Sequence, residues 1–316
     1  MTGPLRAADV PEIRAELTAW LADAGGAHWG REFALRSAAE LPQEYRSDPY
    51  GAAAALAHRA AAGLRDAEMY YVAGEMAQLA AAAGERLPAY RLHHEELPAE
   101  RGLLIWEVPC AVHRTGPLRV PVRAASWAPH GSGVEVILWG LTDDWIAEQE
   151  RVSRVSGNRL RAQLPALDRI ASGVLPYGQP PRWLGPAGWE SEQDHDWHAR
   201  AERTVLATWL LMGQQTLVHA SRTQAPRSAV RRIRRLDPGV PTRITSVQLR
   251  RAMADGQPSG ARERRGHHHR WMVRGHWRKQ WLPAREAHRP VWVSQHVRGP
   301  LGAPLLGAER VGVLRH

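Results

Sequence analysis

Two segments near the end of the chain combine histidine, arginine and tryptophan at strand-like spacing. Residues 270–281 read RWMVRGHWRKQW, and residues 290–298 read PVWVSQHVR. Arginine binds phosphate oxygens in pairs, tryptophan stacks on unpaired bases, and a histidine pair that titrates near neutral pH could serve as general base and general acid in RNA cleavage. The expected ligand of these segments is therefore a polyanion, above all a nucleic acid.

Strand alternation divides these side chains between two faces. The odd positions of residues 270–281 are mostly apolar and the even positions mostly basic, whereas in residues 290–298 the valines take the odd positions. If the two strands pair as a hairpin with their Val and Trp faces inward, the opposite face collects Arg274, His276, Arg278, His296 and Arg298. The alternative is a solvated strand face whose arginines keep a sheet edge soluble.

A second basic segment, residues 227–236, is expected to form a helix. Its candidate phosphate contacts are Arg227, Arg231, Arg232, Arg234 and Arg235. A helix on a phosphate backbone and a solvated face above an apolar stripe both fit this pattern. Residues 223–228 before it resemble part of a helix-turn-helix motif, but the turn glycine and the second amphipathic helix are missing.

The charge of the 316-residue chain is unevenly distributed. Residues 201–316 hold 22 Lys and Arg against 6 Asp and Glu, whereas residues 1–200 hold 20 against 26, within a net charge of +10. The chain is Arg-rich, and Lys279 is its one lysine. A basic half attracts phosphate backbones through long-range, salt-sensitive forces. The alternative interpretation is that the acidic half docks on the basic half.

Other clusters of polar residues predict structure rather than chemistry. Residues 267–269 are three adjacent histidines, which cannot easily ligate one ion together, and no cofactor or metal is expected. Asp143 and Asp144 follow Thr142, where they would cap a helix. Residues 194–198 (DHDWH) mix acids with histidine at a helix entry. Phosphate-binding, dinucleotide-binding, serine-hydrolase and zinc-protease motifs are absent from the sequence.

The cellular compartment is expected to be the cytoplasm. Cys110 is the single cysteine, so an intramolecular disulfide is impossible, and a lone thiol fits a reducing environment. Residues 1–11 contain no apolar segment of the kind found in secretion signals. The most apolar helix-like stretch, residues 205–212, is too short to cross a bilayer, so no membrane partner is expected.

The pattern of elements predicts an α+β fold. We expect a helical N-terminal region (residues 1–95), a mixed region with a small antiparallel sheet (96–200), and a basic α+β region (201–316) that could be continuous with the second. The predicted helices span residues 9–24, 50–65, 66–84, 143–150, 198–221 and 227–236. The predicted strands span residues 103–108, 118–122, 134–139, 243–249, 270–281, 290–298 and 310–314, and residues 252–269 are expected to be a loop.

Several segments also carry a resemblance. The first part of the pattern comprises residues 96–104 and 122–129. The more specific part comprises residues 273–281 (VRGHWRKQW), 291–293 (VWV) and 297–300 (VRGP). In them the chain resembles a group of uncharacterised proteins of high-GC Gram-positive bacteria and of their phages and mobile elements. The resemblance implies a shared fold and a mobile-element context, and it brings no activity and no catalytic residues.

Three hypotheses follow for the function. The first is a nucleic-acid-binding protein of phage, mobile-element or defence context, with RNA and DNA not distinguished. The second is a metal-independent ribonuclease or toxin-like nuclease that uses His276 and His296, so the sequence leaves open whether the chain is an enzyme. The third is a structural or protein-interaction component, in which acidic and basic parts pair within one chain or between copies.

Overall fold

A computed structural model shows how these segments fold. It describes residues 5–35, 47–115, 117–153, 157, 161–179, 182–184, 192–250, 269–283, 286–300 and 303–304. The chain forms two compact units, Met1–Arg250 and Arg251–His316, called unit 1 and unit 2 below. The expected loop over residues 252–269 lies, except for His269, outside the described residues, as does the expected strand at 310–314.

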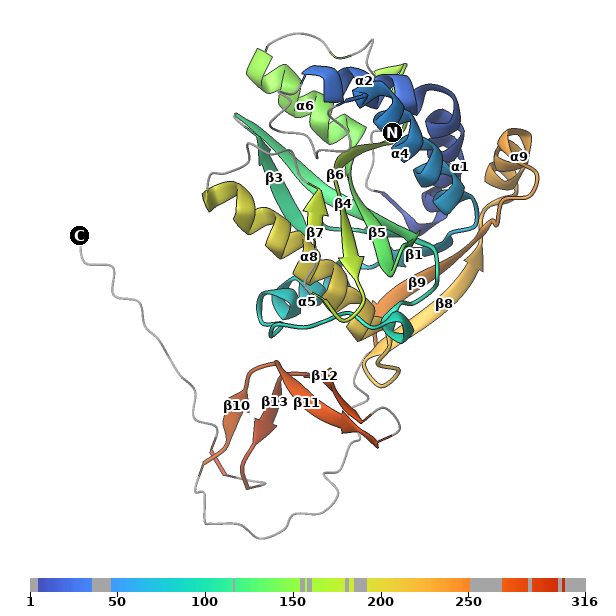
Figure 1. Cartoon of the computed structure of the whole chain (residues 1–316). Coiled ribbons are helices and arrows are strands. Elements are labelled where there is room, and N and C mark those ends of the chain that lie inside the picture. Colours follow the sequence, from blue (N-terminus) through green and yellow to red (C-terminus); the bar gives the residue numbers. More distant parts are fainter. Residues whose placement is uncertain are drawn as a thin grey trace. The chain divides into compact units, whose positions relative to one another are not determined.

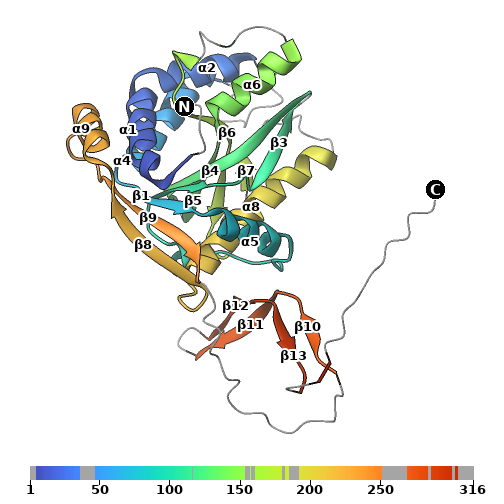
Figure 2. The same ribbon diagram turned by 180° about the vertical axis from the view of Figure 1, so that it is seen from behind.

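Unit 1 is an α+β fold built on one large sheet, which confirms the predicted fold class (Figures 1 and 2). Its helices are α1 (Val10–Trp20), α2 (Gly26–Leu35), α4 (Pro49–Arg65), α5 (Gly74–Glu85), α6 (Thr142–Ser153), α8 (Glu192–Met212) and α9 (Arg227–Leu236). Its strands are β1 (Glu68–Val72), β2 (Gly102–Trp106), β3 (Ala111–Thr115), β4 (Leu118–His130), β5 (Gly133–Leu141), β6 (Leu167–Pro176), β7 (Arg182–Leu184), β8 (Val218–Gln224) and β9 (Arg243–Leu249). A π-helical turn, Leu21–Gly25, joins α1 to α2, and the 3-10 turns Ala7–Asp9 and His94–Glu96 lie before α1 and β2.

The strands of unit 1 follow the order β7-β6-β5-β4-β2-β1-β9-β8, and β3 pairs separately with β4. Strands β2, β1 and β9 are parallel to one another, and the remaining pairs are antiparallel. The sheet is therefore mixed and larger than the small antiparallel sheet that the sequence predicts. The predicted strand at residues 243–249 joins it as β9, between β1 and the edge strand β8.

Strand β1 is the main departure from the predicted elements. The sequence predicts a helix over residues 66–84, but residues 68–72 (EMYYV) form a central strand with partners on both sides. Four of its five side chains are buried. Aromatic and β-branched residues favour such a strand, and here this tertiary environment overrides the helical tendency of the alanine-rich segments that flank it. Gly63 lies inside α4 and does not break it.

One face of the sheet packs against α1, α2 and α4. Ile13 and Leu17 of α1 are buried there, together with Met69 and Tyr71 of β1 and Trp139 of β5. Because side chains alternate along a strand, the neighbouring residues of β1 and β2 point to the opposite face. Helices α1 and α4 are seen over this layer in Figures 1 and 2.

The opposite face packs against α5 and α8 around a cluster of aromatic rings. Trp127 of β4 stacks on Tyr70 at 5.9 Å between ring centroids and meets Trp209 of α8 at 5.0 Å. Trp106 donates from its indole nitrogen to the Thr208 hydroxyl at 3.3 Å. Glycine at position 84 lets α5 approach the α8 backbone, because an added Cβ would lie 3.0 Å from the carbonyl carbon of Arg203. The long helix predicted at residues 198–221 thus lies on this face, and its last residues form β8 instead.

A buried arginine joins α1 to the middle of the sheet. Arg14 is fully buried, and its guanidinium donates to the carbonyl oxygens of Arg65 at 3.2 Å, Ala67 at 3.3 Å and Pro241. Burial lowers the pKa of Arg14 to about 10, against the opposing effect of Asp237, so the side chain stays charged at neutral pH. The three carbonyls belong to the end of α4, the approach to β1 and the approach to β9.

The single thiol of the chain is buried at the start of β3. Cys110 donates its backbone N–H to the Val122 carbonyl of β4 at 3.0 Å, and burial raises the pKa of its thiol. Strand β3 pairs with β4 on one side only among the described strands. None of the described helices combines the length and the apolar character needed to cross a bilayer.

We predict that replacing Arg14 by methionine lowers the free energy of unfolding by about 3 kcal/mol. The substitution keeps an unbranched chain but leaves buried carbonyl oxygens without a donor, which costs roughly 1–3 kcal/mol each in part-buried positions. Urea titration followed by far-ultraviolet circular dichroism measures the change. Arg91→Met, at an exposed position, is the control and should shift stability by less than about 0.5 kcal/mol. Equal midpoints for both variants would show that Arg14 is dispensable.

Candidate functional site

Unit 2 contains the basic histidine and tryptophan segments as one two-stranded ribbon. Its strands are β10 (Trp271–Val273), β11 (His276–Leu282), β12 (Ala287–Val293) and β13 (His296–Arg298). Strand β11 pairs with β12, and β10 pairs with β13, in the same antiparallel register. The two strands expected at residues 270–281 and 290–298 are therefore confirmed, each interrupted by two residues. We call these four strands, with their connections, the C-terminal ribbon; it is drawn in orange to red in Figure 1.

The register of the ribbon corrects the predicted faces. Trp277 lies opposite Trp292, and Arg278 lies opposite Val291. The sequence predicts that the Val and Trp faces of the two strands turn to one side. In this register they do not. The cause is the connection between the strands, because β12 begins at Ala287, three residues earlier than expected. The valines of the second strand consequently share a face with the basic positions of the first strand.

The same register separates the two histidines. His276 lies opposite Val293, and His296 lies opposite Val273. Val273 and His276 are three residues apart, and alternate residues from Trp271 to Arg278 are half-buried and exposed without a break, so the two histidines fall on opposite faces. This pair therefore does not place a general acid and a general base on one face, which the nuclease hypothesis requires.

Each histidine is instead oriented by its own strand. The Nδ1 atom of His276 lies 3.0 Å from the Arg274 carbonyl oxygen, and that of His296 lies 2.9 Å from the Ser294 carbonyl oxygen. A carbonyl oxygen only accepts, so Nδ1 carries the proton and donates in both rings. The Nε2 atom is left for another partner, and it becomes a second donor when the ring is protonated.

The basic side chains of the ribbon are mostly exposed. Arg274, His276, Arg278 and Arg298 are exposed and His296 is half-buried, and no carboxylate among the described residues forms an ion pair with these arginines. Arg278 bonds to the Gln280 side chain at 3.2 Å. The predicted phosphate contacts of the ribbon are thus accessible, but Arg298 and His296 lie on the Trp face, away from the other three.

The basic helix forms at the predicted residues, as α9 in unit 1. Ala229 and Ile233 are buried against Ala15 and Val240, whereas Leu236 of the expected stripe is 49% exposed. The outward positions carry exposed Arg227, Arg231, Arg232, Arg234 and Arg235. Strands β8 and β9 flank α9 in the chain, so a helix-turn-helix motif is not formed.

One of the five arginines of α9 is already paired within the unit. The Arg232 guanidinium donates two hydrogen bonds to the Glu12 carboxylate of α1, one of them at 2.6 Å. This pairing joins the acidic and the basic halves of the sequence, as does the ion pair between Arg65 and Asp237 at 3.0 Å. The four other arginines of α9 remain as candidates for an external anion.

The remaining polar clusters of the sequence lie partly outside the described residues. His198 is buried and its ring lies 3.8 Å from that of Trp197, and the side chains of residues 194–196 lie outside the described residues. Of the three adjacent histidines, residues 267 and 268 also lie outside them. Within the described ranges, no group of three acidic, histidine or cysteine side chains could hold a metal ion.

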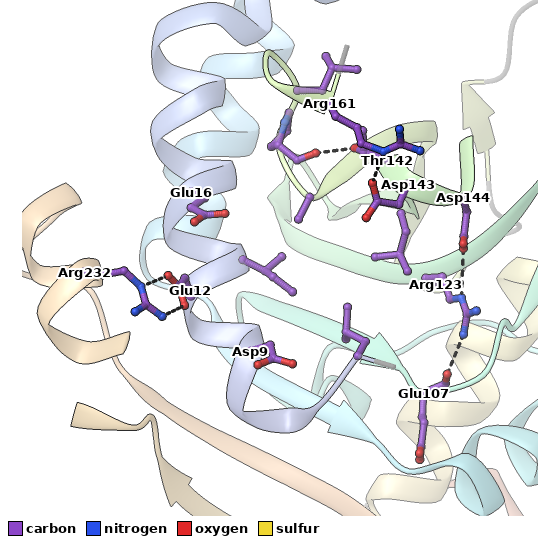
Figure 3. Close-up of a pocket in the computed structure, with 16 residues that line it drawn as sticks. Asp9, Glu12, Glu16, Glu107, Arg123, Thr142, Asp143, Asp144, Arg161 and Arg232 are labelled. Carbon is purple, nitrogen blue, oxygen red and sulfur yellow. Dashed lines mark hydrogen bonds and ion pairs between the residues drawn. The ribbon is translucent and has the colours of Figure 1, made fainter. Parts of the chain in front are cut away.

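Unit 1 also has a pocket of about 780 Å³ that sequence reasoning missed (Figure 3). It lies between α1, the ends of β2 and β5, the middle of β4 and the start of α6. The ionisable residues of its lining are Asp9, Glu12, Glu16, Glu107, Arg123, Asp143, Asp144, Arg161 and Arg232. Six carboxylates face three guanidinium groups, so the lining has a negative net charge.

The arginines of this pocket are held by neighbouring oxygens (Figure 3). Arg123 lies 3.5 Å from the Asp144 carboxylate and donates to the Glu107 carbonyl at 2.7 Å. Arg161 lies 3.1 Å from Asp143, which stands with Asp144 in the first turn of α6. An incoming phosphate would meet no uncommitted guanidinium here, so the pocket does not suit a polyanion.

Two pKa shifts accompany the negative charge. Burial raises the pKa of the Glu16 carboxyl, and the neighbouring Glu12 raises it further. Burial, assisted by Glu107 and Asp9, raises the pKa of Tyr71 to about 12. The Tyr71 hydroxyl donates to the Leu5 carbonyl at 2.9 Å, and a neutral phenol is what this contact needs. The pocket thus favours protonated or cationic groups over anions.

Comparison with known protein families gives no match, and comparison with curated proteins gives none either. The polyanion chemistry predicted from the sequence consequently depends on the geometry of the ribbon and of α9.

We predict that Gly275→Ala destabilises the ribbon by roughly 1–3 kcal/mol, the usual range for overpacking. A Cβ at this position would lie 2.5 Å from Cζ2 of Trp292, whose ring packs against Trp277 at 5.3 Å between centroids. Amide hydrogen exchange of residues 276–293 measures the loss of protection. Gly239→Ala in unit 1 is the control, because its Cβ would meet only Asp237 at 3.6 Å. Unchanged protection would contradict the packing of Trp292 over Gly275.

Proposed function

We propose that the chain is a nucleic-acid-binding protein and that the C-terminal ribbon is its principal contact surface. One observation carries the proposal: residues 270–298 hold seven Lys and Arg and one carboxylate, Glu286, which lies in the connection between β11 and β12. The exposed side chains of both strands are therefore cationic or neutral. Such a surface attracts phosphates from a distance and binds them on contact.

The geometry of a strand suits a phosphate backbone. Arg274, His276 and Arg278 occupy alternate positions of one face, and successive side chains on a face are about 6.6 Å apart. This spacing is comparable with that of neighbouring phosphates along an extended nucleic-acid strand. A two-stranded ribbon is also narrow enough to enter the major groove of a duplex. The arginines give charge and paired donors, and the histidine adds a donor when protonated.

Helix α9, in unit 1, supplies a second basic surface that is separate from the ribbon in the sequence. Its four uncommitted arginines lie on a helix that is anchored by Ala229 and Ile233, so binding a phosphate would not require unpacking of the core. The pairing of Arg232 with Glu12 reduces its contribution. We propose that α9 assists the ribbon by nonspecific attraction.

The other two hypotheses receive less support. The ribonuclease hypothesis needs His276 and His296 on one face, and the register places them on opposite faces. The hypothesis of acidic and basic halves pairing within the chain accounts for the pairing of Arg232 with Glu12, but it leaves the cations of the ribbon unused. The resemblance to proteins of phages and mobile elements is compatible with a nucleic-acid ligand, and a mobile-element context remains part of the proposal.

We predict salt-sensitive binding that depends on the ribbon. In fluorescence-anisotropy titrations of the full chain with labelled nucleic acid, the logarithm of affinity should fall linearly with the logarithm of salt concentration. The double variant Arg274→Ala/Arg278→Ala should weaken binding by about tenfold or more and reduce the salt slope by about 2, since each lost phosphate contact removes about one unit.

The control for this experiment is Arg91→Ala, which removes one positive charge from an exposed position of unit 1. It should leave the affinity within about twofold and the slope unchanged, because it removes no phosphate contact. Failure of the wild-type chain to bind RNA or DNA at low salt would refute the proposed function. Equal weakening by Arg91→Ala would show that only net charge matters and that the ribbon is no specific surface.

A further inference from the structure

The tryptophans of the ribbon differ in their surroundings. Trp277 and Trp292 pack together, and Trp292 is 6% exposed, so these two rings form the core of the ribbon. Trp281 lies near the end of β11 and is 49% exposed. About half of the Trp281 surface is therefore not used in the packing of the ribbon and is available to a ligand.

The neighbours of Trp281 are suited to a negatively charged ligand. His288 lies directly opposite in the register, with ring centroids 5.0 Å apart and the planes inclined at 61°. Lys279 precedes Trp281 by two residues, so it is exposed on the same face of the ribbon, which is opposite the face of Arg274, His276 and Arg278. An aromatic surface beside a lysine and a histidine provides a flat apolar contact next to donors for phosphate.

Among polyanions, this combination distinguishes between paired and unpaired nucleic acid. The faces of paired bases are covered by their neighbours in the duplex, and only an unpaired base can place its ring on a protein aromatic side chain. Stacking of bases on aromatic residues above a positively charged surface is the general mode of single-strand binding. A surface for duplex alone would have no use for an exposed indole outside the ribbon core.

We propose that Trp281, flanked by Lys279 and His288, is a stacking site for an unpaired base, and that the ligand of the ribbon is single-stranded nucleic acid. This inference rests on the proposed function and specifies its ligand class. Lys279 and His288 contact the phosphates on either side of the stacked base. Trp281 is a binding residue, and no bond is made or broken.

The test compares two ligands and three variants of the full chain. A labelled oligothymidylate and a blunt duplex of the same length are titrated by fluorescence anisotropy against the wild type, Trp281→Ala, Trp281→Leu and Trp281→Phe. Alanine and leucine should weaken single-strand binding by about 10- to 100-fold, the contribution of one base stack. Phenylalanine should restore most of the affinity, because it keeps an aromatic face. Duplex affinity and the salt slope should stay unchanged in all three variants.

Met272→Ala is the matched control, because Met272 is another exposed apolar residue of the ribbon, 45% exposed in β10. It should leave both affinities unchanged. Leucine retains apolar bulk without an aromatic face, so a loss shared by alanine and leucine but not phenylalanine separates stacking from a folding defect.

The outcomes distinguish this inference from the proposed function. No binding of either ligand by the wild type would refute both. Wild-type binding that all three variants retain would refute the stacking site and leave the basic ribbon as a nucleic-acid surface. An equal loss of single-strand and duplex binding in the variants would also refute the stacking site, since it would assign Trp281 a role in ribbon stability.

Discussion

The hydrogen bonds of one buried arginine connect the first helix of unit 1 to its sheet, and the positions of the other surface elements depend on this connection. The Arg14 guanidinium joins α1 to carbonyls at the end of α4 and before β1 and β9, two parallel strands inside the sheet. Three segments distant in the sequence thus share one charged donor. Burying a charge costs free energy, and the charge is tolerated here because carbonyl oxygens accept hydrogen bonds from the guanidinium. The position of α1 in turn places Glu12 against α9, so the basic helix depends indirectly on the same contact.

The uneven charge of the sequence has two structural outcomes. Part of it is neutralised inside unit 1, where α1 and α9 exchange an ion pair and the pocket at the end of the sheet keeps its arginines bound to oxygen atoms. The rest, among the described residues, is left on α9 and on the C-terminal ribbon, whose two strands contain no carboxylate. The negative charge of the pocket repels phosphates, whereas the cations of the ribbon attract them. A search for a polyanion surface therefore leads to the ribbon, and a search for a cationic ligand leads to the pocket.

Local patterns predicted much of the fold, and contacts between distant segments account for what they missed. The bounds of α9 and β9 agree with the prediction, because their apolar periodicity and flanking prolines are local signals. Strand β1 has five residues between alanine-rich helices, and only its partners on both sides make it a strand. In the ribbon, alternation identified the two strands, but their pairing is set by the length of the connection after Leu282. A difference of one residue in register decides whether His276 and His296 share a face, and composition contains no signal for it.

The buried thiol at the start of β3 can be used to measure local opening of the sheet. Cys110 is the one cysteine of the chain, and its thiol is both inaccessible and hard to ionise in the folded state. Strand β3 has a single partner among the described strands, and it also contacts α8, where the His113 and Trp197 rings lie 4.5 Å apart. The rate at which a thiol reagent labels native protein would then measure how often this margin of the sheet opens, while the remainder of the fold stays closed.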